Sequence, residues 1–152
     1  MEMDILFLDV DGVLNPSNGS HPHIFAPECV GQLRRILDSR PQVQIVFSTS
    51  WRTGMAFFRL GWLWRQHDLP QQRVIGRTPE FDTQTRGVEI KQWLDDAARY
   101  WRTDRIRRYA VLDDETEPIL HHIPEHSVFH CEHQHGLTAE IADRVIRHFS
   151  VE

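Results

Sequence analysis

Short apolar runs alternate along the chain with longer segments in which apolar residues recur at helical spacing. Strand-like runs lie at residues 5–8, 43–47, 73–75, 109–112 and 127–130. Helical spacing is found at residues 27–37, 55–64, 90–101 and 138–149, with a shorter helical segment at 116–122. This alternation predicts an α/β fold, a three-layer sandwich with a mainly parallel central sheet and right-handed crossovers.

Two residue types mark where helices are expected to begin. Pro27 suits the first turn of a helix, where its missing N–H has no partner to lose. Thr138 is expected to cap the last helix through its hydroxyl. Residues 76–86 (GRTPEFDTQTR) are typical of a loop.

Composition and charge indicate the kind of protein and the setting in which it works. The 152 residues are 40% hydrophobic and 26% charged, which predicts a single globular domain over residues 1–152. No apolar run is long enough to cross a bilayer, so we expect no membrane partner. Cys29 and Cys131 form no close motif, which favours a reducing, cytoplasmic setting. The net charge of -5 argues against broad non-specific binding to nucleic acid.

Polar residues follow three of the predicted strands. They are Asp9 and Asp11 after the first strand, Ser48, Thr49 and Ser50 after the second, and Asp113 and Asp114 after the strand at 109–112. In a parallel sheet the carboxyl ends of the strands lie at one edge, where ligands bind. The three clusters are therefore expected to converge on one site.

Four acids brought together would repel one another unless a cation lay between them. Oxygen ligands favour Mg²⁺, and a metal held by carboxylates beside hydroxyl groups suits phosphoryl transfer. One carboxylate can attack phosphorus, and a second can protonate the leaving oxygen and then activate water. Gly12 lets the backbone bend after the first strand, bringing amide N–H groups towards phosphoryl oxygens.

Four strings of the sequence resemble, in order, the motifs of the haloacid dehalogenase-like (HAD) hydrolase superfamily. They are DVDGVLN, the strand ending STS, a basic residue near a helix start, and VLDD, and they span residues 5 to 114. STSWR, RGVEIKQWL, VLDDE and HGLT are similar to the small HAD domains of RNA-repair proteins. The resemblance implies a Rossmann-like core and hydrolysis of phosphoesters through an aspartyl-phosphate.

The resemblance also implies roles for the four acids. Asp9 would be the nucleophile and a Mg²⁺ ligand, and Asp11 the general acid/base with its backbone carbonyl on the metal. Asp113 would bind Mg²⁺ directly and Asp114 through water. The presence of Asp11 favours phosphoester hydrolysis, because dehalogenases of the superfamily lack this second aspartate.

The resemblance leaves the phosphate-binding groups partly open. The resemblance implies that Thr49 would be the motif-two hydroxyl, with Ser48 as the alternative, and that Ser50 would assist through its amide or hydroxyl. Arg52 is a candidate for binding a substrate phosphate, since guanidinium groups bind phosphate in a bidentate fashion; the alternative is a surface salt bridge.

The basic residue of motif three has two candidates. Lys91 is the only lysine, but it lies a turn inside the helix at 90–101, next to a core-facing residue. Arg86, in the predicted loop before that helix, is better placed to reach a strand-end site.

The tryptophans divide by their positions. Trp93 and Trp101 lie on the apolar face of one helix and are expected in the core. Trp62 and Trp64 cannot share a helical face, so one is expected to be exposed. Trp51 flanks the predicted site and is the candidate for stacking on a substrate.

Segment lengths leave little room for a large cap domain. The 36 residues between Asp11 and Ser48 must also supply a helix. An open site would accept a phosphate on a small molecule or on a nucleic-acid end. We therefore expect a Mg²⁺-dependent phosphatase, with nucleotide or nucleic-acid phosphoesters as candidate substrates; the alternative is a catalytically weak HAD module that binds or regulates a partner. The sequence leaves the oligomeric state open.

Overall fold

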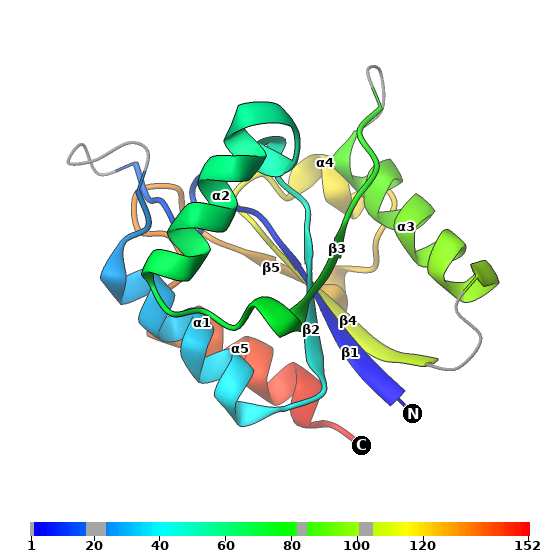
Figure 1. The fold of residues 1–152 in the computed structure, drawn as a ribbon. Coiled ribbons are helices and arrows are strands. Elements are labelled where there is room, and N and C mark those ends of the chain that lie inside the picture. Colours follow the sequence, from blue (N-terminus) through cyan, green and yellow to red (C-terminus); the bar gives the residue numbers. More distant parts are fainter. Residues whose placement is uncertain (1, 18–23, 82–84, 101–104) are drawn as a thin grey trace.

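The computed structural model describes residues 2–17, 24–81, 85–100 and 105–152 (Figure 1). The strands are β1 (Glu2–Leu8), β2 (Val43–Phe47), β3 (Val74–Arg77), β4 (Arg105–Asp113) and β5 (Val128–His130). The helices are α1 (Pro27–Ser39), α2 (Gly54–Gln66), α3 (Arg86–Tyr100), α4 (Glu117–Leu120) and α5 (Ala139–Ser150). A short 3₁₀ turn, η1 (Ser50–Arg52), joins β2 to α2.

All five strands run parallel in one sheet with the order β3-β2-β1-β4-β5. The chain starts in the centre at β1, adds β2 and β3 on one side, and then returns to add β4 and β5 on the other. Leu8 of β1 pairs with Phe47 of β2 and with Leu112 of β4, so these strands end at the same level. The order changes direction between β1 and β4, which is where ligands bind in sheets of this kind.

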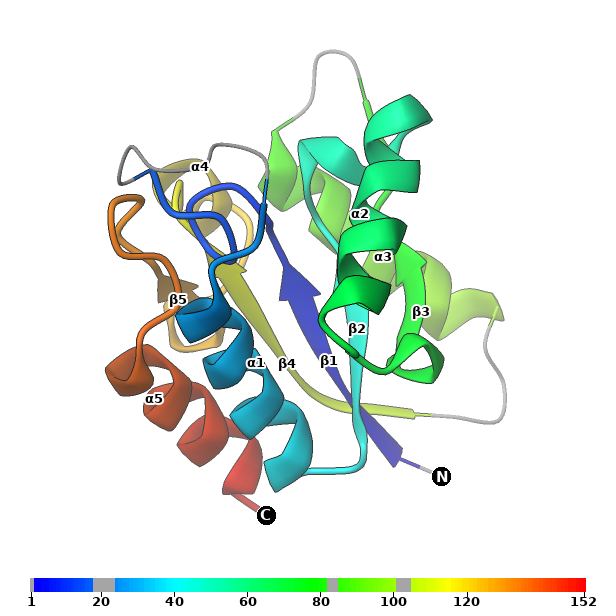
Figure 2. The same cartoon turned by 60° about the vertical axis from the view of Figure 1, so that its left-hand side comes forward.

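Helices cover both faces of the sheet, which confirms the predicted three-layer arrangement (Figure 2). Leu6 and Leu8 of β1 face a core shared with α1, α2 and α5. Ile5 and Phe7, the alternate residues, face a second core formed with α3 and α4. Because β1 is buried on both faces, its sequence is a continuous apolar run rather than an alternating one.

The helix starts agree with the predictions at α1 and α5. Pro27 is the first residue of α1, and the Thr138 hydroxyl accepts a hydrogen bond from the Ile141 amide at the start of α5 (3.4 Å). Within α2, Trp64 is buried and Trp62 is 53% exposed, as expected from their spacing. Trp93 is also buried as predicted, whereas Trp101 lies outside the described residues.

One strand is longer than the sequence pattern predicted. β4 begins at Arg105 rather than at Tyr109 and pairs with β1 from its first residue. The Arg107 guanidinium donates two hydrogen bonds, 3.0 and 2.9 Å long, to the carboxylate of Asp4 on β1, which is fully buried. This bidentate pair allows a charged segment to continue the sheet.

The described residues contain no separate cap domain over the edge where β1 and β4 end. After β1 they form a tight turn and then α1, and after β2 they form η1, α2 and β3. Across the same described ranges, no helix combines the length and the apolar character needed to span a membrane.

Candidate active site

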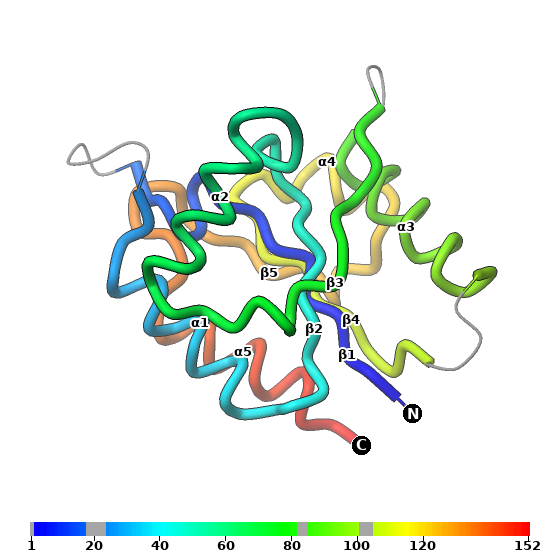
Figure 3. Tube along the Cα trace, in the orientation of Figure 1, coloured from blue at the N-terminus to red at the C-terminus, as the bar shows by residue number. Residues whose placement is uncertain are grey.

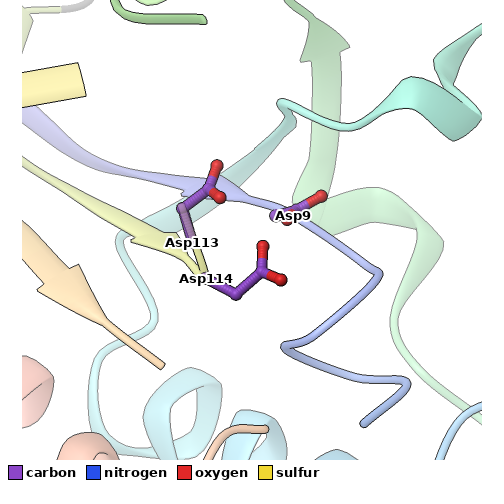
Figure 4. Close-up of side chains that lie close together, drawn as sticks. All are labelled: Asp9, Asp113 and Asp114. Carbon is purple, nitrogen blue, oxygen red and sulfur yellow. The ribbon is translucent and has the colours of Figure 1, made fainter. Parts of the chain in front are cut away.

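Three carboxylates meet where β1 and β4 end (Figure 4). Asp9 follows β1, Asp113 is the last residue of β4 and Asp114 comes next. One oxygen of each lies within 4.8 Å of an oxygen of the others. Asp9 and Asp113 are buried, and Asp114 is partly exposed.

The backbone turn after β1 passes close to the carboxylates of Asp9, Asp113 and Asp114, which are called the acidic cluster below. The Asp9 amide donates to the Leu112 carbonyl (3.1 Å), which keeps the chain in line with β4 for one more residue. Gly12 then has a φ of 77°, which side-chain-bearing residues rarely adopt. A Cβ at Gly12 would lie 2.2 Å from a carboxylate oxygen of Asp114. Glycine is therefore needed both for the turn and for the close approach.

Arg86, the first residue of α3, provides the positive charge beside the cluster. Its Nη1 lies 2.7 Å from Oδ2 of Asp113 and 3.3 Å from Oδ2 of Asp9. The other oxygens accept backbone hydrogen bonds, Asp9 Oδ1 from the Val10 amide (2.8 Å) and Asp113 Oδ1 from the Glu115 amide (2.9 Å). Both buried carboxylates are thus fixed in orientation.

The electrostatic balance of the cluster remains unfavourable despite Arg86. Burial, together with the charge of Asp113, raises the pKa of Asp9 to about 9, against the opposing effect of Arg86. Burial also raises the pKa of Asp113, which Arg86 again opposes. Burial lowers the pKa of Arg86, but the nearby carboxylates outweigh it and the net direction is upward. Arg86 therefore does not offset the cost of holding these buried carboxylates in their charged forms.

Asp11 lies beside the acidic cluster, and its side chain is held by residues outside that cluster. Its carboxylate is exposed and accepts hydrogen bonds from the Trp51 indole N–H (2.9 Å) and from the Asn15 side-chain amide (3.3 Å). It is not one of the three clustered carboxylates. The Asp11 side chain is thus positioned by the turn after β2 as well as by its own turn.

The three hydroxyl residues after β2 have different surroundings. Thr49 is buried, and its Oγ1 accepts from the Trp51 amide (3.3 Å). The Ser48 Oγ is also buried and has no hydrogen-bond partner among the described residues. Ser50 is exposed and lines a cavity of about 350 Å³ that Arg86 and Glu115 also border. Ser48 and Thr49 are therefore both candidates for the phosphate-binding hydroxyl.

The two candidates for the motif-three base lie in different places. Arg86 contacts Asp9 and Asp113, whereas Lys91 is exposed on α3 and forms no ion pair within the described part of the chain. Arg86 belongs to the helix and not to the predicted loop, since α3 begins four residues earlier than its apolar spacing indicated. The first turn of α3 thereby places Arg86 at the end of the sheet, beside Asp9 and Asp113.

Arg52 forms a salt bridge, as the alternative expected, but the pair is buried and does not lie at the surface. Its guanidinium donates to the Thr49 carbonyl (2.6 Å) and to Oε1 of Glu89 on α3 (2.9 Å), and both side chains are buried. Oε2 of Glu89 accepts from the Phe81 amide (2.9 Å). Glu89 is not among the site residues predicted from the sequence, although it stands one turn after Arg86 on the same helix, a spacing that brings side chains to one face.

Trp51 lies at the site as predicted, but it binds Asp11 and is not placed for stacking on a substrate. Only 7% of the residue is exposed, and its indole N–H is bound to Asp11. Little of the ring is accessible for stacking on a substrate. Trp51 and Asn15 are instead the side chains that hold Asp11. No pattern in the sequence indicates these contacts.

Fold and site together define a class: a HAD-type α/β domain with acids at the ends of β1 and β4 and, among the described residues, no cap domain over the sheet edge. The family of the HAD domain in Swiss Army Knife RNA repair proteins matches residues 5–142, and the chain belongs to this family. Comparison with curated proteins and with solved structures gave no match.

Proposed function

We propose that this protein is a Mg²⁺-dependent phosphatase that works through an aspartyl-phosphate on Asp9. The observation that carries the proposal is the buried acidic cluster with Arg86 against it at the end of β1 and β4. A carboxylate fixed beside a guanidinium and further acids suits attack on a phosphate, whose negative charge must be offset.

The residues fit a magnesium ion. Three carboxylate oxygens within 4.8 Å of one another form an oxygen donor set, the kind that Mg²⁺ prefers. Burial and the charge of Asp113 raise the pKa of Asp9 despite Arg86, so further positive charge there would stabilise its charged form, which supports the proposal. Asp9, Asp113 and Asp114 would hold the ion, with the Asp11 carbonyl as a further ligand. When bound, Mg²⁺ would supply charge neutralisation for the transferring phosphoryl group.

Side chains of the protein carry out the remaining steps of the proposed reaction. A carboxylate oxygen of Asp9 attacks phosphorus, and the bond from phosphorus to the leaving oxygen breaks. Asp11, held by Trp51 and Asn15, gives its proton to that oxygen and then takes one from the attacking water. Water displaces Asp9 from phosphorus, which releases inorganic phosphate and restores the free carboxylate. Arg86 orients Asp9, and a hydroxyl of Ser48 or Thr49 would bind a phosphoryl oxygen.

The substrate we propose is a phosphorylated RNA end. The family to which the chain belongs is described by its occurrence in RNA repair proteins. The described residues leave the sheet edge without a cap domain, so a phosphate attached to a long polymer would not have to be enclosed. Small phosphoesters such as nucleoside monophosphates would also be admitted.

Phosphate release tests the proposal. The purified protein is incubated with nucleotides, 3'- and 5'-phosphorylated oligoribonucleotides and phosphosugars, with Mg²⁺ or with EDTA. We expect release that requires Mg²⁺ and is abolished in Asp9→Asn. Asp143→Asn is a matched control, because Asp143 is half exposed and paired with Arg35 on α1. Tight binding of a phosphorylated partner without turnover would favour the binding-module alternative instead.

A further inference from the structure

The outer face of α2 carries an apolar stripe. Met55, Phe58 and Trp62 are 81%, 75% and 53% exposed, whereas Leu60 and Leu63 on the opposite face are buried against the sheet. The exposed residues recur at i, i+3 and i+7, so they form one row along the helix. Together with arginine side chains they line a shallow hollow of about 730 Å³.

The charge on this face is of one sign. Arg59 and Arg65 border the hollow, and α2 contains no acidic residue. A dimer formed through this face would set α2 against its own copy and bring arginines together, which is unfavourable. An occupant that carries negative charge and flat apolar groups fits better, although the chain as a whole has a net charge of -5.

The stripe begins at Met55, soon after η1, and η1 borders the cavity beside Arg86. Thr53 both ends η1 and caps the start of α2, and Ser50 of η1 lines the cavity next to Arg86. Figure 3 shows the chain rising through β2 and passing by this turn into α2. A polymer whose end lies at Asp9 would therefore meet α2 on leaving the site, which favours the substrate itself over an acidic protein.

The spacing of the aromatic rings suits successive bases. Phe58 and Trp62 are one helical turn apart, about 5 to 6 Å along the axis. Aromatic side chains next to cationic groups are the usual stacking surface for single-stranded nucleic acid, because every base offers a flat face. Arg59 and Arg65 would contact the intervening phosphates.

We propose that the outer face of α2 binds single-stranded RNA, with bases on Phe58 and Trp62 and phosphates at Arg59 and Arg65. The choice of RNA rests on the proposed function. The stripe holds the part of the strand that leads away from the phosphorylated end. It would thereby favour oligonucleotides over mononucleotides at the same site.

Binding to a labelled, single-stranded ten-nucleotide oligoribonucleotide without a terminal phosphate tests the surface apart from catalysis. Phe58→Ala and Trp62→Ala are each expected to weaken binding by about fivefold to a hundredfold. Tyr100→Ala is the control, since Tyr100 is also an exposed aromatic beside an arginine, but on α3. Equal affinity of all these variants and the wild type would overturn the proposal.

Two further probes separate stacking from other contacts. An oligoribonucleotide made abasic at every position should bind more weakly, because it keeps the phosphates but offers no base to stack. Unchanged affinity for the abasic strand would contradict the aromatic role. Binding of poly-glutamate at the affinity of RNA, lost in Trp62→Ala, would assign the face to an acidic protein and refute the RNA assignment.

Activity measurements keep this inference distinct from the proposed phosphatase. The Phe58→Ala, Trp62→Ala double variant should hydrolyse a nucleoside monophosphate at the wild-type rate and lose kcat/KM only on phosphorylated oligoribonucleotides. If the wild type hydrolyses neither substrate, the phosphatase proposal fails while the binding measurements still decide the role of α2. Equal loss on both substrates would count against a separate RNA surface.

Discussion

The buried ion pair between Arg52 and Glu89 joins three segments around the candidate site. Arg52 Nη2 lies 2.9 Å from Oε1 of Glu89, and the two side chains are 5% and 6% exposed. Arg52 also binds the Thr49 carbonyl after β2, and Glu89 binds the Phe81 amide before α3. Replacing Glu89 with Gln preserves the shape of the side chain but removes the charge that offsets the guanidinium.

The expected loss of stability is large for one substitution. Removing one partner of a buried pair leaves the other charge uncompensated, at a cost of about 3 to 5 kcal/mol. For a chain of this size each kcal/mol lowers the melting temperature by roughly 2 to 4 °C. The Glu89→Gln protein should therefore melt roughly 6 to 20 °C below the wild type. Since total stabilities are about 5 to 15 kcal/mol, the variant should still fold at low temperature.

Thermal and urea unfolding measure this effect directly. The double variant Arg52→Met, Glu89→Leu should lose less stability than the sum of its single substitutions, because no unpaired charge remains buried. Asp143→Asn removes an ion pair in which both side chains are 47% exposed and should change stability by less than about 1 kcal/mol. A loss in Glu89→Gln no larger than in this surface control would refute the reasoning.

Three further predictions concern the turn after β1, the contact to Asp11 and the helix α5. Gly12→Ala would force a Cβ to within 2.2 Å of Asp114 at a φ of 77°. It should reduce phosphate release about a hundredfold while the circular dichroism spectrum stays that of the wild type. Wild-type activity in this variant would contradict the prediction. Trp51→Phe removes the 2.9 Å hydrogen bond to Asp11 and should lower kcat about tenfold with KM for a nucleoside monophosphate unchanged; a change in KM alone would refute this role. Burial lowers the pKa of His148, so its neutral form is favoured in the folded state and stability should fall as the pH drops from about 7.5 to about 5. His148→Gln should reduce that pH dependence of the urea midpoint, and an unaltered dependence would count against it.

The fold could be predicted because its strands and helices leave recognisable patterns within short stretches of the sequence. A strand buried on both faces is an apolar run, and acids directly after such runs stand out in the sequence. The first four residues of β4 could not be predicted in this way, since Arg105 to Arg108 is mostly charged. Their place in the sheet depends on Asp4, about a hundred residues away, which no local pattern reveals.

The surroundings of the site residues were harder to predict than the residues themselves. Periodicity placed Arg86 in a loop because the first turn of α3 has little apolar character, although its ion pairs place it against the acids. Arg52 has the chemistry of a phosphate ligand, and only the tertiary fold shows that Glu89 binds its guanidinium. Likewise, the contact of Trp51 with Asp11 depends on how β1 and β2 align.

Trapping of the aspartyl-phosphate tests the central claim most directly. The protein would be mixed with a substrate carrying a labelled phosphate and Mg²⁺, quenched in acid during turnover and digested. We predict label on the peptide that contains Asp9, released by hydroxylamine as expected for an acyl phosphate, and absent from Asp9→Asn. Sustained phosphate release in the Asp9→Asn protein, or turnover with the label on another residue, would contradict the account.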